Sequence, residues 1–270
     1  MRRALAGTGP TLLLVTAGCT DSAVDAPPRL VEPAASAAAA TPTASRQDAD
    51  EVARTLASLR RVDDLPLYEM TYAGGYDPTV GTDARPASGP FGCSLFAAGG
   101  DPARPLVARN FDWAAHPAMV LRTDPPDGYA SVSMGDLSYL GVGSDPTGDR
   151  RLLNAPLLPF DGMNERGLAV GVAADDHATA KPVPGRPTVG SVRILRLVLD
   201  RAATVDEAVA VFERHNLDFD GGPPLHYLLA AAAGRSAVVE FVAGTMRVQR
   251  GEVRLVPAGG GERRYRLPVS

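Results

Sequence analysis

The sequence is poor in cysteine and lysine, and each scarcity narrows the kinds of protein it encodes. Its two cysteines, Cys19 and Cys93, lie in very different surroundings, so no disulfide framework is expected. Lys181 is the only lysine, and 27 basic residues stand against 31 acidic ones. Because this balance leaves no basic surplus for a phosphate backbone, we expect no nucleic-acid partner.

Long apolar runs are also absent, which disfavours a membrane-spanning helix. The run Leu12–Val15 is far shorter than the ~20 residues that cross a bilayer. With arginines before it and small residues after it, residues 1–18 are typical of a secretory signal peptide. Ala17 and Gly18 directly precede Cys19, as a lipoprotein signal peptidase requires. We therefore expect an exported protein, lipid-anchored through Cys19 on the outer face of the cytoplasmic membrane; the alternative is a secreted protein.

The remaining chain divides into three parts by composition. Residues 19–46 are rich in alanine and proline, which predicts an extended tether after the lipidated cysteine. Residues 47–92 read as a propeptide or N-terminal arm, with an amphipathic helix over Asp48–Arg61. Residues 93–270 form the main domain, and a hydrophobic content of 45% with 21% charged residues is ordinary for globular protein.

The order of predicted elements indicates an α+β fold. Short strand-like runs come first, two helices follow over Val189–Arg201 and from Thr204 to about His215, and strands then return. The helix after Thr204 opens with a capping box that ends at Glu207. The predicted strands are Leu67–Tyr72, Cys93–Ala98, Leu106–Trp113, Ala118–Arg122, Tyr129–Met134, Gly167–Ala173, Leu225–Ala232, Ala237–Val242, Met246–Arg250 and Val253–Val256.

The most informative segment places Cys93 and Arg109 on two strands that flank a turn-rich stretch. This pattern predicts a hairpin, and a simple antiparallel register brings Arg109 opposite Cys93. A guanidinium beside a thiol favours the thiolate, the reactive form of cysteine. Asp112 lies on the opposite face of a regular strand, so it joins the site only if a bulge or the strand's end re-aims it. The alternative is a buried free cysteine with a surface arginine and aspartate.

Three elements of the sequence carry a resemblance to a known family: Cys93, the run Arg109–Trp113, and the run Asp161–Leu168. In this order and spacing they resemble the N-terminal-nucleophile (Ntn) amidases related to choloylglycine hydrolases and penicillin V acylases. Acid ceramidase and the N-acylethanolamine amidases are more distant members. The resemblance covers about residues 90–256 and implies a four-layer αββα sandwich.

The resemblance also implies a mechanism for hydrolysis of linear amide C–N bonds. Members cleave themselves before the nucleophile, here between Gly92 and Cys93, and the freed amine, with an ordinary pKa of about 7.7–8.0, serves as base. The resemblance assigns contact with the nucleophile to Arg109 and positioning of the amine to Asp112. It assigns an oxyanion-binding backbone N–H to Ala174. A thioester acyl-enzyme then forms on an N-acyl amide substrate, without cofactor or metal.

The C-terminal residues depart from the family pattern. Relatives place a second oxyanion donor, an asparagine, after the strand that matches Val253–Val256, and continue well beyond it. This sequence instead reads Pro257–Ser270. We therefore expect a truncated or frame-shifted form of a longer enzyme, or a shortened relative that completes its fold as a homo-oligomer. The alternative function is a catalytically inactive relative, either a lipid-anchored binding protein or a non-functional fragment.

Overall fold

A computed structural model describes residues 44–80, 92–98, 105–112, 115–220 and 222–252. The predicted signal peptide, Cys19 and most of the tether therefore lie outside the described residues, as do Trp113 and the predicted strand Val253–Val256. The helices are α1 (Ala49–Ala57), α2 (Ile194–Arg201) and α3 (Val205–Glu213), with two 3-10 helices, η1 (Leu137–Leu140) and η2 (Arg150–Leu157).

The strands form one large sheet and two small ones. The nine strands of the large sheet are, in spatial order, β1 (Arg60–Arg61), β2 (Leu67–Tyr72), β5 (Ala118–Thr123), β6 (Ser131–Asp136), β7 (Asp161–Asn164), β8 (Leu168–Ala174), β11 (Leu225–Ala231), β12 (Arg235–Val242) and β13 (Thr245–Glu252). The small sheets are the hairpin of β3 (Gly92–Ala98) with β4 (Leu106–Asp112), and the parallel pair of β9 (Thr188–Gly190) with β10 (Asn216–Asp218).

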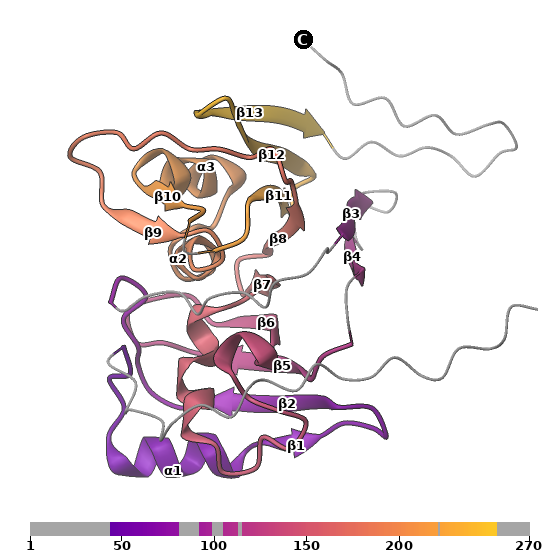
Figure 1. Ribbon diagram of the computed structural model, residues 1–270, viewed down its shortest axis with the longest axis vertical. Helices are drawn as coiled ribbons and strands as arrows, with labels where there is room; N and C mark the ends of the chain where they lie inside the picture. The colour runs from indigo at the N-terminus through magenta and orange to yellow at the C-terminus, as the bar shows by residue number, and fades with distance from the viewer. Residues whose placement is uncertain (1–43, 81–91, 99–104, 113–114, 221, 253–270) are drawn as a thin grey trace, which may run out of the picture.

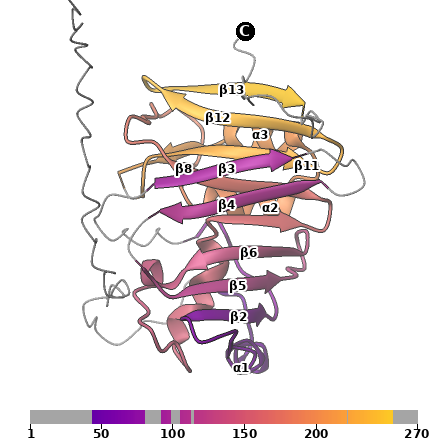
Figure 2. The same ribbon diagram turned by 90° about the vertical axis from the view of Figure 1, so that its right-hand side faces the viewer.

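The described elements are arranged in three layers. Helices α2 and α3 cover one face of the large sheet, and the hairpin β3–β4 lies over the opposite face, in front of β8 (Figures 1 and 2). The predicted α+β class is confirmed. A second helical layer, expected on the outer side of the hairpin, does not occur among the described residues. The hydrophobic core lies between the sheet and the helices, where strand residues on the helix-facing side alternate with those on the other side.

One pairing of the large sheet is parallel, that of β2 with β5. The other neighbouring strands of this sheet pair antiparallel. A parallel pair requires a crossover connection. Here the connection is made by residues 73–117, which include the hairpin β3–β4. The hairpin therefore belongs to the link between two adjacent strands of the sheet that it covers.

The helix ends follow from local sequence. Asp48 caps α1 through a capping box with Glu51, and this helix ends at Ala57, before the predicted end at Arg61. Thr204 caps α3 by accepting the N–H of Glu207. The prediction of one helix over 189–201 is wrong at its start, because Thr188–Gly190 forms β9 and α2 begins at Ile194.

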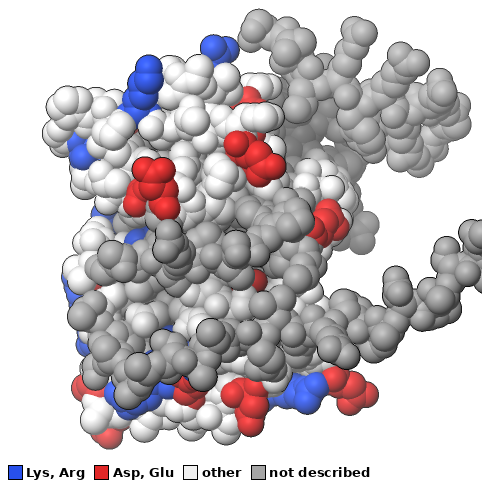
Figure 3. Space-filling view, in the orientation of Figure 1, with Lys and Arg blue, Asp and Glu red and all other residues white. Residues whose placement is uncertain are grey.

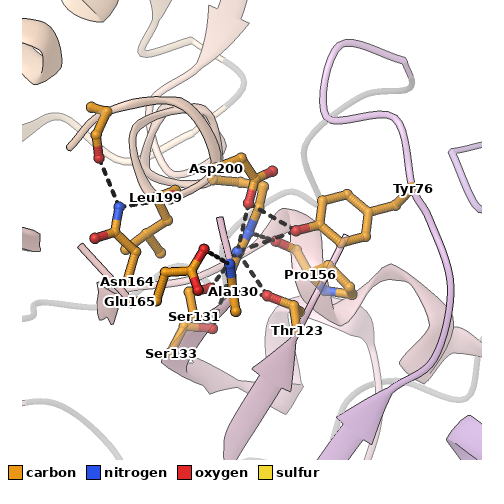
Figure 4. A network of polar contacts seen from close by, with 12 residues as sticks. Tyr76, Thr123, Ala130, Ser131, Ser133, Pro156, Asn164, Glu165, Leu199 and Asp200 are labelled. Carbon is orange, nitrogen blue, oxygen red and sulfur yellow. Dashed lines mark hydrogen bonds and ion pairs between the residues drawn. The ribbon is translucent and has the colours of Figure 1, made fainter. Parts of the chain in front are cut away.

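A buried polar network joins the N-terminal segment to α2 and the sheet (Figure 4). Its centre is Arg196, whose side chain is completely buried. The guanidinium donates to six partners, which are Tyr76, Thr123, Ser131, Ser133, Pro156 and Asp200. Tyr76 also donates its hydroxyl to Asp200 over 2.9 Å. Burial raises the pKa of Asp200, against the lowering effect of Arg196.

Charged side chains of both signs can be seen on one face of the molecule. Acidic and basic side chains are interspersed over the described residues of the face in Figure 3. Within the described part of the chain, every helix is too short or too polar to traverse a bilayer.

Candidate active site

The hairpin places Cys93 and Arg109 on the same face, toward the large sheet. Cys93 pairs with Phe111, and Arg109 pairs with Leu95. The predicted register, with Arg109 directly opposite Cys93, is therefore wrong, because Phe111 holds that place two residues further along β4. Arg109 nevertheless reaches Cys93 diagonally, because alternate residues of paired strands share a face.

Arg109 links Cys93 to the large sheet. Its Nη2 lies 3.3 Å from Sγ of Cys93, and its Nη1 lies 3.1 Å from Oδ2 of Asp161, the first residue of β7. The Arg109 side chain is 5% exposed and the Asp161 side chain 30% exposed. Burial raises the pKa of Asp161, although the guanidinium beside it acts in the opposite direction.

The hairpin approaches the sheet closely at Gly171 in β8. A Cβ atom at this position would lie 2.5 Å from Cδ2 of Leu95 and 3.8 Å from Cδ of Arg109. Contacts shorter than 3.0 Å force a neighbour to move. A residue without a side chain at position 171 therefore lets the hairpin settle against β8.

Aromatic rings surround the end of the hairpin that carries Cys93. The ring of Phe111 lies 5.8 Å from that of Phe160, which in turn lies 4.8 Å from the ring of Tyr139. Burial raises the pKa of Tyr139, and negative charge on Asp136 and Cys93 acts in the same direction. These rings form an apolar wall beside the thiol.

The structure does not bring the Asp112 side chain to this face. β4 is regular through Asp112, which pairs with Gly92 and is exposed. Its Oδ1 accepts a hydrogen bond of 2.8 Å from Asn110, whose own Oδ1 accepts the N–H of Ser94. Asp112 thus lies beside the backbone position of the predicted cleavage, on the face opposite to the Cys93 thiol.

The N–H of Ala174 is directed away from β11. Asp175 donates its N–H to the carbonyl of Pro224, beside β11, and Val172 donates to the carbonyl of Phe160, beside β7. Because N–H groups alternate between the two sides of a strand, the N–H of Ala174 has the direction of that of Val172. The N–H of Ala174 therefore points to the β7 side of β8, at a level before the first residue of β7.

Other features of the described residues do not add to this site. No group of three or more His, Cys, Asp or Glu side chains is gathered in a metal-binding arrangement within the described part of the chain. A surface hollow of about 530 Å³ lies between β1, β2 and residues 144–147, and its lining includes neither Cys93 nor any residue described around it. It does not bear on the chemistry of Cys93.

Comparison with known families identifies the chain. The model of the acyl-coenzyme A:6-aminopenicillanic acid acyl-transferase family matches residues 100–256. The chain belongs to this family. This acyl-transferase family member is also 29% identical over 161 residues, 53% of the chain, to a penicillin V acylase of Pectobacterium atrosepticum. The predicted resemblance to the penicillin V acylase type of Ntn hydrolase is thereby confirmed. The match covers 42% of that relative, so the chain spans less than half the length of the curated relative it matches.

Two solved structures are partly similar to this acyl-transferase family member. A penicillin V acylase of Agrobacterium tumefaciens aligns with a TM-score of 0.36 and 23% identity, over 63% of this chain and 43% of the other. A mutant of a conjugated bile acid hydrolase of Clostridium perfringens aligns with a TM-score of 0.44 and 18% identity, over 60% of this chain and 50% of the other.

Sequence reasoning missed one residue of the site, Asp161. Its signal was present, since Asp161 opens the run Asp161–Leu168 that carries the family resemblance. Asn164 holds a turn after this residue, because its Oδ1 accepts the N–H groups of Arg166 and Leu168. The strand before this turn, β7, was not predicted.

Proposed function

We propose that the protein hydrolyses linear amide C–N bonds of N-acyl compounds with Cys93 as nucleophile. In this proposal the chain cleaves itself between Gly92 and Cys93, and the freed α-amine acts as base. The observation that carries it is the 3.3 Å contact between Nη2 of Arg109 and Sγ of Cys93. Membership of a family named for acyl transfer from acyl-coenzyme A to 6-aminopenicillanic acid supports chemistry at an acyl carbonyl.

The proposed reaction has two steps. The Cys93 amine takes the thiol proton while sulfur attacks the amide carbonyl, and collapse of the tetrahedral intermediate expels the amine product with that proton. A thioester remains on Cys93, and water then attacks it, releasing a carboxylic acid and restoring the thiol. Arg109 favours the thiolate, and the N–H of Ala174 is the proposed donor to the oxyanion.

The first experiment is the intact mass of the purified protein beside its Cys93→Ala variant. Cleavage between Gly92 and Cys93 in the wild type, but not in the variant, is the expected result. A panel of N-acyl amides with different acyl groups then tests hydrolysis, with Asp206→Ala as a control because Asp206 lies in α3, away from the hairpin. A wild-type chain that stays intact and inert toward the panel would rule the proposal out.

A second function has one observation in its favour, the position of Asp112. In the uncut chain Asp112 lies on the face opposite to the thiol and bonds to Asn110. This arrangement favours a catalytically inactive relative that binds an N-acyl ligand. Binding of an uncleaved amide by both the wild type and Cys93→Ala, measured by calorimetry without product formation, would support this alternative.

We also propose that Cys19 carries a lipid that anchors the exported protein to the membrane. The proposal rests on Ala17 and Gly18 directly before Cys19, after an apolar run. Metabolic labelling with a radioactive fatty acid is expected to mark the wild type and not Cys19→Ser. Absence of label in the wild type would leave secretion as the better explanation, and equal labelling of both proteins would place the lipid on another residue.

A further inference from the structure

The guanidinium of Arg109 is held on several sides. Its Cζ lies 3.5 Å from the centre of the Phe111 ring, while its two terminal nitrogens reach Cys93 and Asp161. Phe111 and Cys93 belong to the same hairpin as Arg109. Outside the hairpin, Cζ lies 5.8 Å from the centre of the Phe160 ring, and Asp161 ties the guanidinium to the large sheet by an ion pair.

The geometry of a guanidinium makes that tie directional. Nη1 and Nη2 belong to one rigid planar fork, so fixing Nη1 on a carboxylate also aims Nη2. A charged side chain with 5% exposure also requires a partner of opposite charge, because an unpaired buried charge is strongly unfavourable. Asp161 meets both requirements for Arg109.

Asp161 is itself fixed by the sheet. As the first residue of β7 it pairs with Met134 on one side and Gly171 on the other. The backbone of Met134 also lowers the pKa of its carboxyl, against the effect of burial. The carboxylate therefore has a position that is set independently of the hairpin.

We propose that Asp161 is a positioning residue that holds Nη2 of Arg109 against Sγ of Cys93. It acts through Arg109 and not on the substrate, and this inference rests on the proposed role of Cys93. Other titratable groups near this end of the hairpin are Asp112, on its outer face, and Tyr139, Asp136 and His116, which contacts Phe111 edge-on.

The test is the pH profile of alkylation of Cys93 by iodoacetamide, followed by intact mass. The full chain carries Cys19→Ser, so that Cys93 is the only thiol, and cut and uncut species are followed separately. In Asp161→Asn the guanidinium loses its charged partner on the sheet. Nη2 is then no longer held against Sγ, so the thiolate loses its neighbouring cation. We expect the half-maximal pH to rise by about one unit, which slows alkylation on the acidic limb about tenfold.

A second variant keeps the inference testable if Asp161→Asn does not fold. Asp161→Glu keeps the charge that the buried guanidinium needs but displaces the carboxylate by one methylene, so we expect a smaller rise. The matched control is Asp206→Asn, which removes an exposed carboxylate paired with Arg235 and Arg250 and should leave the profile unchanged. An unchanged or lowered half-maximal pH in whichever Asp161 variant folds would overturn the inference.

The readout also separates this inference from the proposed function. Alkylation needs neither self-cleavage nor amide turnover. A raised half-maximal pH in a protein that hydrolyses no amide would uphold the positioning role and reject the amidase. If the wild type hydrolyses amides and the half-maximal pH of alkylation is unchanged in the Asp161 variants, the amidase is upheld and the positioning role is rejected.

Discussion

The N-terminal segment 44–80 and the hairpin β3–β4 are attached to the large sheet by different means. The segment contributes β2 to the sheet itself, hydrogen-bonded to β5, and Tyr76 enters the buried network around Arg196. The hairpin lies across the sheet and contacts it through side chains such as Leu95 and Arg109. The N-terminal segment is thus part of the core, whereas the hairpin packs on the face of the sheet.

The two regions also differ in how far their apolar side chains are exposed. The helix-facing side of β2 is buried, with Met70 and Tyr72 at 0% and 2% exposure. The outer face of the hairpin leaves Phe96 at 56% exposure, and Leu106 at the hairpin's end is 55% exposed. Changes in the N-terminal segment should therefore alter global stability, and changes under the hairpin should mainly alter the reactivity of Cys93.

The largest effect is expected from Arg196→Met. Removing the guanidinium leaves Asp200 buried without its counter-charge, which costs about 3–5 kcal/mol. Urea unfolding monitored by circular dichroism measures the loss. The control is Arg201→Met on the same helix, where an exposed arginine should change stability by less than about 0.5 kcal/mol. Equal effects of the two changes would mean that the network does not stabilise the fold.

A smaller effect on stability, with a clear effect on the thiol, is expected from Gly171→Ala. The added Cβ meets Cδ2 of Leu95 at 2.5 Å, so the Leu95 side chain or the hairpin that carries it must shift, at a cost of about 1–3 kcal/mol. Alkylation of Cys93 should slow at the same time, because Arg109 moves with the hairpin. The control is Gly135→Ala in β6, where the Cβ meets the carbonyl of Leu158 at an ordinary 3.4 Å. An unaltered rate of alkylation in Gly171→Ala would show that the position of the hairpin against β8 does not determine the reactivity of Cys93.

The third prediction concerns the two chains that the proposed cleavage would produce. Because β2 pairs with β5 and Tyr76 lies in the Arg196 network, residues before Gly92 should remain bound to the rest of the protein. Native mass spectrometry is expected to show one complex, and denaturant should release two fragments. Dissociation under native conditions would mean that the N-terminal segment is a removable propeptide.

The smallest expected effect concerns Asp77. Its pKa is lowered to about 2, chiefly by the hydroxyl and backbone of Thr79 and then by Arg46. A carboxyl with a lowered pKa stabilises the fold above its unfolded value of 3.8, and this contribution is lost as the pH falls toward about 2. In Asp77→Asn, stability should vary less over this interval, by below about 1 kcal/mol because such pairs are solvent-screened. Parallel pH–stability curves for variant and wild type would contradict the assignment.

Local patterns predicted much of the fold. Alternating apolar residues predicted β2 with its observed bounds, Leu67–Tyr72, and Thr204 predicted the start of α3. β7 could not be predicted because Asp161–Asn164 is short and contains glycine. It is a strand because it pairs with β6 on one side and β8 on the other. The prediction of a helix from Val189 is wrong at its start, because β9 forms only through pairing with β10, about 28 residues further on.

The candidate site was predictable in its residues and not in its geometry. Cys93 and Arg109 could be recognised, but their register depended on the turn between them, and the residue opposite Cys93 is Phe111 instead of Arg109. The contact of Arg109 with Asp161 spans 52 residues, so it follows from how the hairpin stacks on the sheet and from no local pattern. The roles of Cys93, Asp112 and Ala174 in catalysis stay predictions.

The crossover between the parallel strands β2 and β5 has a consequence for the energetics of cleavage. In the intact chain the hairpin is part of a closed loop, because both ends of residues 73–117 are fixed in adjacent strands. Closing such a loop has an entropic cost that is met once, when the sheet forms. A cut between Gly92 and Cys93 opens the loop, so β3 becomes a free end while β4 remains tethered to β5. The cut strand then gains conformational freedom, and its backbone pairing with β4 and the side-chain contacts beneath it oppose its departure.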